Sequence, residues 1–182
     1  MCRPLYCCFG LSSQEFERLT LYGFSLIYPK DWVVSIDERS SRENGSLRIR
    51  LGNEAMINVV WGPLKKMKEK LPSPKDHAEY ALKGIKREGD VMKVKLLSVE
   101  RADTDLHEAY IAHSRVTRIF GAFLIYKYIE QEMLSLHVYC EESGRFFVVY
   151  GITGPTLFPE YEDMIRKILL SFRCHGEGRV EV

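Results

Sequence analysis

Apolar and polar residues alternate along the first third of the chain in a way that predicts β-strands. Residues 23–28 are rich in β-branched and aromatic side chains and stop at a Pro-Lys-Asp turn, after which residues 32–37 resume extended character. Residues 47–51 alternate apolar and basic side chains with period two, which is typical of a half-buried strand. The short Gly-Asn-Glu segment at 52–54 then predicts a hairpin into a strand over residues 55–61.

Two amphipathic helices are predicted from capping residues and from apolar positions at helical spacing. The first begins at Ser73, which can cap it, has Pro74 in its first helical position, and ends near Gly89. Its apolar stripe is formed by Ala78, Ala81, Leu82 and Ile85. The second helix begins near Pro159, with acidic residues in its first turns and basic residues toward its end, where each favours the helix dipole. Its apolar stripe is formed by Tyr161, Ile165, Ile168, Leu169 and Phe172.

Between the two helices the pattern predicts four or five further strands. These segments are 92–100, 108–120, 123–130, 134–141 and 145–152. The turns between them are short enough for hairpins, which favours antiparallel pairing over parallel crossovers. The predicted fold class is therefore α+β, with a single antiparallel β-sheet meander and helices packed on both of its faces, an α/β/α sandwich.

The predicted domain covers residues 16–175, because a chain of 182 residues has the size of one ordinary domain. It follows an N-terminal segment over residues 1–15, for which disorder is one interpretation, and precedes a frayed tail over residues 176–182. Residues 12–20 fit either one or two helical turns or a strand that starts near Phe16.

The composition excludes several classes of protein. With 46% hydrophobic, 12% aromatic and 28% charged residues, the chain is not disordered, collagen-like or a coiled coil, and no apolar run approaches the roughly 20 residues that span a bilayer. Twenty-six basic residues against 25 acidic ones leave a net charge of +1, so we expect neither a nucleic-acid nor a membrane partner. No signal peptide is readable at the start, which predicts a cytoplasmic protein, and the scarcity of Asn and Gln is typical of thermophile proteins.

Two stretches at the ends of the predicted domain carry a family pattern. The first is YGFSLIYPKDW at residues 22–32, which ends in a Pro-x-x-Trp corner, and the second is RFFVVYGIT at residues 145–153, followed by the helix over residues 164–173. In these stretches the chain resembles the PsbP-like family, which includes the extrinsic PsbP protein of photosystem II and a yeast nuclear-import factor that binds the Ran GTPase. The resemblance implies a PsbP-like fold and a binding or accessory role without a catalytic centre common to the family. The cysteine-rich start of the chain is not part of the family pattern.

Histidine and cysteine residues offer two candidate metal sites, with solvated histidines and unreactive thiols as the alternative at each. His107 and His113 are six residues apart in a β pattern, so the helical zinc motif with its four-residue spacing is absent. His113 and His137 could approach one another if their strands are neighbours. A set of thiolate and imidazole ligands would form, if the two termini meet in space, from Cys7, Cys8, Cys174 and His175. We recognise no catalytic motif and no cofactor site.

Basic residues provide the first candidate surface for a protein partner. They lie before the first helix and on the predicted strand over residues 47–51, and are Lys65, Lys66, Lys68, Lys70, Arg48 and Arg50. Trp61 is a further candidate because Gly62 and Pro63 follow it and could leave its ring exposed, with core packing as the alternative.

These observations predict a non-catalytic binding or accessory protein with an unknown protein partner. An unprotected edge of the sheet would also permit a homodimer. The alternative is a metal-binding or small-ligand-binding protein, or an enzyme, that uses a pocket on the sheet.

Overall fold

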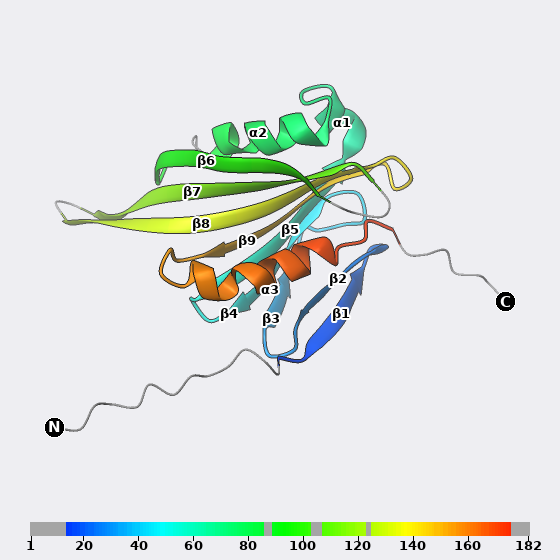
Figure 1. The fold of residues 1–182 in the computed structure, drawn as a ribbon. Helices are drawn as coiled ribbons and strands as arrows, with labels where there is room; N and C mark the ends of the chain where they lie inside the picture. The colour runs from blue at the N-terminus through cyan, green and yellow to red at the C-terminus, as the bar shows by residue number, and fades with distance from the viewer. Residues whose placement is uncertain (1–13, 86–88, 103–106, 123–124, 176–182) are drawn as a thin grey trace.

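The computed structural model describes residues 14–85, 89–102, 107–122 and 125–175, and its elements are labelled in Figure 1. The first two strands, β1 (Phe16–Leu21) and β2 (Phe24–Pro29), form a hairpin. The two turn residues, Tyr22 and Gly23, have φ angles of 50° and 87°, which matches the positive φ values of a tight primed turn. Strand β1 starts at Phe16, which confirms the predicted strand near that residue over the alternative of helical turns. The predicted tail (176–182) lies outside the described residues.

The other seven strands form one antiparallel sheet in the order β3-β4-β5-β9-β8-β7-β6. Their bounds are β3 (Val33–Ile36), β4 (Gly45–Leu51), β5 (Ala55–Pro63), β6 (Val91–Ala102), β7 (Ala109–Ala122), β8 (Ile125–Cys140) and β9 (Arg145–Thr153). The sheet consists of two meanders, one from β3 to β5 and one from β6 to β9, which meet where β5 pairs with β9. Antiparallel pairing is thus confirmed. The prediction of a single meander is wrong, because among the described strands β1 and β2 form a separate two-stranded sheet and β5 pairs with β9 instead of β6.

Contacts with the C-terminal helix explain why the β1–β2 hairpin stands apart from the large sheet. Phe24 and Leu26 are fully buried in the core together with residues of α3 (Phe158–Leu170). The backbones of Ser25 and Arg173 exchange two hydrogen bonds of 2.8 Å just beyond the end of that helix. The hairpin is therefore anchored by the segment that follows α3.

Strand β8 continues through residues 131–133, which the sequence pattern predicts to be a turn between two strands. Glu132 is buried in this region and accepts hydrogen bonds from two residues of β7, Arg115 at 2.6 Å and His113 at 2.8 Å. A carboxylate with such partners can remain buried in a strand. The predicted strands 123–130 and 134–141 are consequently one strand.

Two helices precede β6, namely α1 (Leu64–Lys68) and α2 (Pro74–Ile85). The predicted cap of α2 is confirmed, because the Ser73 hydroxyl accepts a 3.1 Å hydrogen bond from the Asp76 backbone N–H and donates one of 2.6 Å to its carboxylate. Ala78 is buried, whereas the side chains of Ala81, Leu82 and Ile85 lie outside the described part of the chain. Among the described helices, none has the length and apolar content that crossing a membrane requires.

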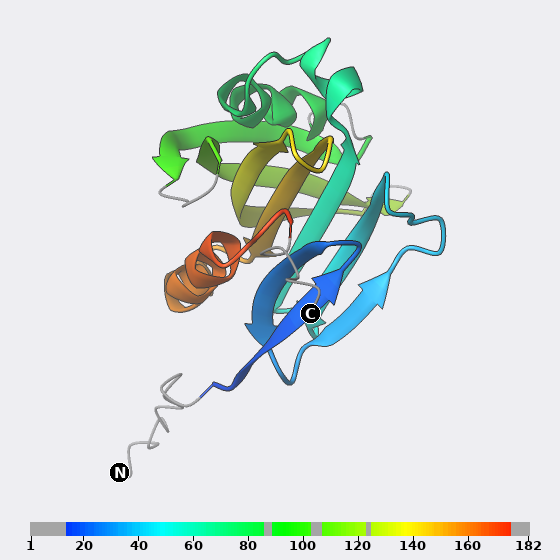
Figure 2. The ribbon, with the colours of Figure 1, turned by 90° about the vertical axis from the view of Figure 1, so that its right-hand side faces the viewer.

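The layers follow from which helix contacts which strands. Helix α2 packs on β6, β7 and β8, while α3 packs on β8, β9 and β2, and Figures 1 and 2 show the two helices on opposite sides of the large sheet. The predicted apolar stripe of α3 is confirmed, since all of its members are buried: Tyr161, Ile165, Ile168, Leu169 and Phe172. In β9, every second residue from Arg145 to Thr153 is buried toward α3, and the residues between them face the other side.

Gly151 lies where α3 comes closest to β9, which allows a test of this packing. A Cβ atom at this position would overlap Cγ2 of Ile165 and lie 3.0 Å from Cδ1 of Ile57, and both isoleucines are fully buried. We expect Gly151→Ala to lower the free energy of unfolding by about 1–3 kcal/mol, because the core must shift to admit the methyl group. Urea denaturation measures the change. Gly154→Ala is the control, since a Cβ there meets nothing within 4 Å, and equal stability of the two variants would contradict the close approach of α3.

Candidate functional site

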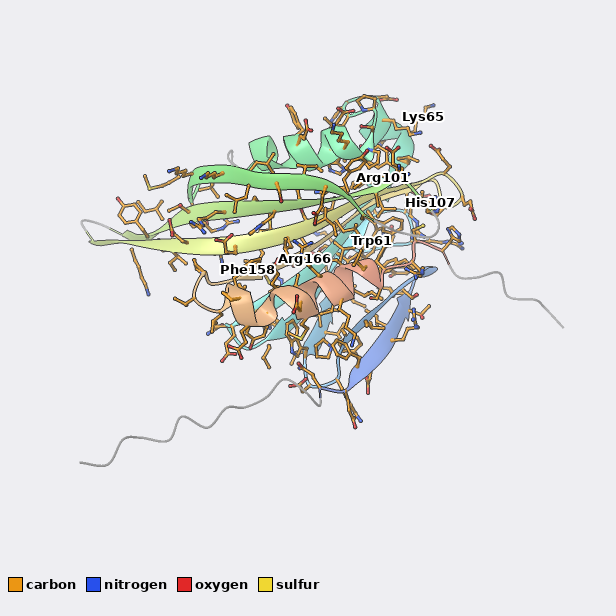
Figure 3. All side chains as sticks on the ribbon, in the orientation of Figure 1. Trp61, Lys65, Arg101, His107, Phe158 and Arg166 are labelled. Carbon is orange, nitrogen blue, oxygen red and sulfur yellow. The ribbon has the colours of Figure 1, made fainter. Side chains whose placement is uncertain are left out.

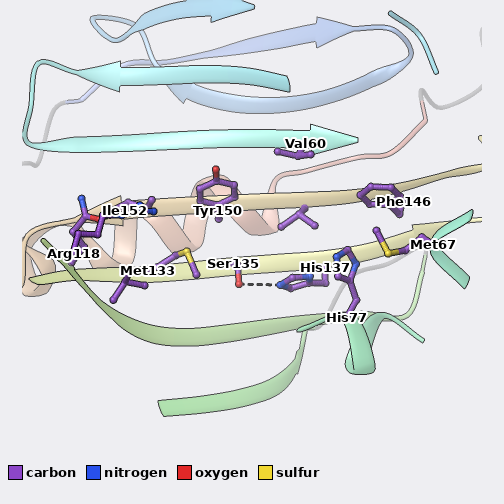
Figure 4. A pocket seen from close by; sticks show the side chains of 13 residues that line it. Val60, Met67, His77, Arg118, Met133, Ser135, His137, Phe146, Tyr150 and Ile152 are labelled. Atoms are coloured by element: carbon purple, nitrogen blue, oxygen red, sulfur yellow. Dashed lines mark hydrogen bonds between the residues drawn. The ribbon is translucent and has the colours of Figure 1, made fainter. Parts of the chain in front are cut away.

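Helix α2 leaves part of its face of the sheet uncovered, and a pocket of about 340 Å³ occupies that region. The pocket extends along β8 and β9 from Met67 of α1 and His77 of α2 at one end to Arg118 at the other (Figure 4). It is lined by Val60, Met67, His77, Val116, Arg118, Gln131, Met133, Ser135, His137, Phe146, Val148, Tyr150 and Ile152. Most of these side chains are apolar, and those of β9 are half-buried.

Two histidines form one end of the pocket. The rings of His77 from α2 and His137 from β8 are 4.7 Å apart between centroids and nearly perpendicular, and both are buried. Nε2 of His137 lies 3.0 Å from the hydroxyl of Ser135, which itself donates to the carbonyl oxygen of Ala112 at 3.4 Å. When the Ser135 hydroxyl donates to Ala112, Nε2 of His137 is the donor to Ser135 and its Nδ1 is left as an acceptor. Within the described residues, Nδ1 of His77 and Nδ1 of His137 are buried without a hydrogen-bond partner.

Burial keeps both of these imidazoles neutral. It lowers the pKa of His77 from 6.5 to about 4. It also lowers the pKa of His137 well below its ordinary value, with a further lowering from the neighbouring His77. At neutral pH this end of the pocket is therefore polar but uncharged.

A charged pair closes the other end of the pocket, as Figure 4 shows for Arg118. Arg118 donates hydrogen bonds of 3.0 and 2.9 Å to the two carboxylate oxygens of Asp90 and one of 3.2 Å to Gln131. The hydrogen bond from Arg118 lowers the pKa of Asp90, so this carboxylate stays ionised and balances the guanidinium. Because Gln131 and His137 are six positions apart in β8, the pocket is about 20 Å long. Its shape and chemistry suit an elongated apolar molecule with a neutral hydrogen-bonding group at the histidine end.

The predicted pair of His113 and His137 does not form a site. His113 lies opposite Leu134 in the β7–β8 register, stacks on Phe158 of α3 and binds Glu132, so it lies on the α3 side of the sheet. His137 lies on the α2 side. Neighbouring positions in a strand face opposite sides, and this parity separates the two imidazoles.

The predicted metal ligands Cys174 and His175 lie beside other side chains that can bind a metal, but these are not the predicted Cys7 and Cys8. Cys174 and His175 lie beside Cys140 and His107, and one ligand atom from each of these four residues lies within 4.8 Å of the others. The predicted ligands Cys7 and Cys8 fall outside the described residues. Sequence reasoning missed Cys140 and considered His107 only together with His113; the signal was that both lie at the ends of predicted strands, where two strand ends and a chain segment can meet.

The prediction of Trp61 as an exposed partner contact is wrong. Its side chain is only 2% exposed, packs against Phe24 and donates a 2.9 Å hydrogen bond from Nε1 to the carbonyl oxygen of Ser41. Gly62 and Pro63 continue β5 after the tryptophan instead of opening the chain around it.

The structure separates the predicted basic residues into two groups. The exposed lysines lie on α1 and just after it, and Lys68 forms an ion pair with Glu141. Arg48 lies opposite Asn58 in the β4–β5 register, and Asn58 is six positions, or about 20 Å, before the first residue of α1; Arg50 is farther still. The arginines and lysines therefore do not form one continuous patch.

Comparison with known proteins identifies the fold. No protein-family model matches the chain, and no curated protein matches it significantly in sequence. The solution structure of cyanobacterial PsbP (CyanoP) from Synechocystis is similar, with a TM-score of 0.65, 18% sequence identity, and coverage of 94% of this chain and 99% of that one. The crystal structure of the Saccharomyces cerevisiae Ran-binding protein Mog1p is also similar, with a TM-score of 0.57, 8% identity, and coverage of 88% and 96%. These likenesses confirm what the two terminal stretches of the domain imply, namely that the chain has a PsbP-like fold.

Proposed function

We propose that the chain is a non-catalytic binding protein, built as an α/β/α sandwich, that holds a small, elongated and mainly apolar molecule in the pocket beside α2. The observation that carries this proposal is the pair of buried Nδ1 atoms, those of His77 and His137, at the end of a mostly apolar cavity. A volume of about 340 Å³ lies in the range of small-molecule sites.

The chemistry of the histidine end selects the polar group of the occupant. A buried polar atom without a hydrogen bond costs about 1–3 kcal/mol. A hydroxyl group that donates to Nδ1 of His137 would recover part of this cost, while an apolar body would cover Val148, Tyr150 and Ile152. Because both imidazoles are neutral, they attract an anion no better than a neutral group, and a neutral hydroxyl is cheaper to desolvate.

The fold and the surface support a binding role in a second way. Mog1p has the same fold and is named a Ran-binding protein, although a partner does not transfer with a fold. Lysines 65, 66, 68 and 70 are exposed around Met67, which lines the pocket, so a protein partner at α1 would adjoin the bound molecule. Replacing these four lysines with glutamate should abolish capture of such a partner. Dimerisation through an edge strand stays a prediction.

Binding of 4-butylphenol and of its methyl ether, 4-butylanisole, tests the pocket. We expect the phenol to bind with a Kd in the micromolar to millimolar range and to shift backbone amide NMR signals of β8 and β9. The ether should bind about fivefold more weakly, because it cannot donate the hydrogen bond to His137. His137→Phe should remove this difference between the two compounds.

A matched pair of tryptophan substitutions locates the binding. Val148→Trp places a large ring in the pocket and should weaken phenol binding at least about tenfold. Val33→Trp adds the same ring on β3, where valine is 59% exposed, and should leave binding unchanged. Undiminished binding by the Val148→Trp protein, with its thermal unfolding still cooperative, would refute the pocket as the binding site.

A further inference from the structure

We propose that His107, Cys140, Cys174 and His175 together bind one zinc ion in a tetrahedral site. The four residues come from three separate parts of the chain: His107 lies two residues before the start of β7, Cys140 is the last residue of β8, and Cys174 and His175 lie in the segment after α3. Figure 3 shows His107 at the end of the sheet from which the C-terminal segment leaves. The site is independent of the pocket, since Cys140 is buried in the core on the α3 side of β8.

The backbone around each cysteine holds its sulfur in place. Sγ of Cys140 accepts a 3.4 Å hydrogen bond from the backbone N–H of Ser143, in a turn that Gly144 completes with a φ of 65°. An N–H donor of this kind favours the thiolate that a metal requires. Cys174 directly follows Arg173, whose backbone N–H and carbonyl oxygen both form hydrogen bonds with the backbone of Ser25. Both sulfurs therefore sit on anchored backbone and are buried.

The orientation of His175 is a second and independent indication of a metal. Its Nδ1 faces the two sulfurs, at 3.5 Å from Cys140 and 3.3 Å from Cys174, while its Nε2 lies 3.2 Å from a carboxylate oxygen of Glu142. Histidine ligands of metals commonly donate their other ring nitrogen to a carboxylate in this way, which fixes the tautomer and the ring orientation. The ring of His107 completes the group at 5.2 Å from that of His175.

The donor set and its dimensions select zinc. Two thiolates and two imidazoles are typical of tetrahedral zinc sites, and ligand atoms around such an ion lie about 3.3–3.8 Å apart. The distances from His175 to the two sulfurs already have these values, and the widest separation of 4.8 Å would need to shorten by about 1 Å. Four protein ligands leave no open position, so the ion would tie three chain segments together without a catalytic role.

Charge balance favours a divalent cation at this place. Two buried thiolates would carry two negative charges, which the interior does not tolerate without compensation. Arg145 is buried and interacts electrostatically with both cysteines, but it supplies a single positive charge. A zinc ion would supply the two positive charges that neutralise both thiolates.

Metal analysis of the full chain tests the proposal. We expect protein purified without chelator to contain one zinc per chain, and cobalt-substituted protein to show the intense ligand-field absorption of tetrahedral cobalt together with a thiolate-to-cobalt band. Cys140→Ser and Cys174→Ser should each lose stoichiometric zinc and weaken that band. Glu142→Gln keeps all four ligands and should weaken zinc affinity about 10- to 100-fold.

Two controls separate this site from other ligands and from unfolding. His113→Gln changes a histidine outside the cluster, and a combined Cys2→Ser, Cys7→Ser and Cys8→Ser variant removes the remaining thiols; both should retain one zinc. Wild-type protein should melt at a lower temperature after EDTA and recover with added zinc, a measurement that needs no variant. Absence of stoichiometric zinc together with no cobalt spectrum, or zinc retained when Cys140 and Cys174 are replaced, would overturn the proposal. A Cys140–Cys174 disulfide in the protein as purified, before any treatment with chelator, would also overturn it.

Discussion

Trp61→Ala is expected to lower the free energy of unfolding by about 3–5 kcal/mol. The indole packs against Phe24 and Tyr22, with ring centroids 5.2 and 5.9 Å away, and its Nε1 binds the carbonyl oxygen of Ser41. Alanine would leave a cavity between β2 and β5 and remove the donor that holds the β3–β4 loop. Urea denaturation, monitored by circular dichroism, measures the loss. Tryptophan fluorescence is unsuitable as the signal because the substitution removes one of the two tryptophans.

Two further variants show which part of the Trp61 side chain matters. Trp61→Phe keeps most of the apolar volume and loses the hydrogen bond, so it should cost less than alanine does. Tyr128→Ala removes an aromatic ring that is 60% exposed and should change stability by less than about 0.5 kcal/mol. A Trp61→Ala protein as stable as the Tyr128→Ala protein would restore the interpretation of Trp61 as a surface contact.

Features that depend on a short stretch of chain could be predicted from the sequence. The Ser73 cap, the apolar stripe of α3 and the hairpin around residues 52–54 each follow from local spacing, because a side-chain pattern records which face of an element is buried. The pairing of β5 with β9 joins segments about 90 residues apart, and no local pattern contains it. The burial of Trp61 could not be predicted from a local pattern either, because it depends on Phe24 of β2 packing over β5.

The candidate sites depended still more on long-range geometry. His113 and His137 lie on neighbouring strands, as expected, but the register places them on opposite faces of the sheet. Cys174 and His175 were identified as metal ligands with the wrong partners, since the packing of α3 brings them to Cys140 and His107. The pocket is defined by how far α2 extends across the sheet, and a helix sequence does not reveal that position.

Stability is expected to fall as the pH drops from about 6.5 to 4, owing to the two histidines of the pocket. In the unfolded chain a histidine takes up a proton near pH 6.5, whereas burial lowers the pKa of folded His77 to about 4. Between these values the unfolded state binds more protons, so acid favours unfolding. His77 alone should account for a loss of about 3 kcal/mol across this window, and His137, whose pKa burial also lowers, adds to it.

Urea denaturation at a series of pH values from 7.5 to about 4.5 measures this slope, and three glutamine substitutions assign it. His77→Gln and His137→Gln should each reduce the slope by up to about 1.4 kcal/mol per pH unit, because glutamine takes up no proton in either state. His113→Gln removes a histidine on the other face of the sheet and serves as the matched control. Carboxylates with lowered pKa values, such as Asp90, lose their contribution only at lower pH, so the histidine window is distinct. If His77→Gln and His137→Gln both kept the wild-type slope, the two imidazoles would titrate alike in the folded and the unfolded chain, and burial would not hold this end of the pocket neutral.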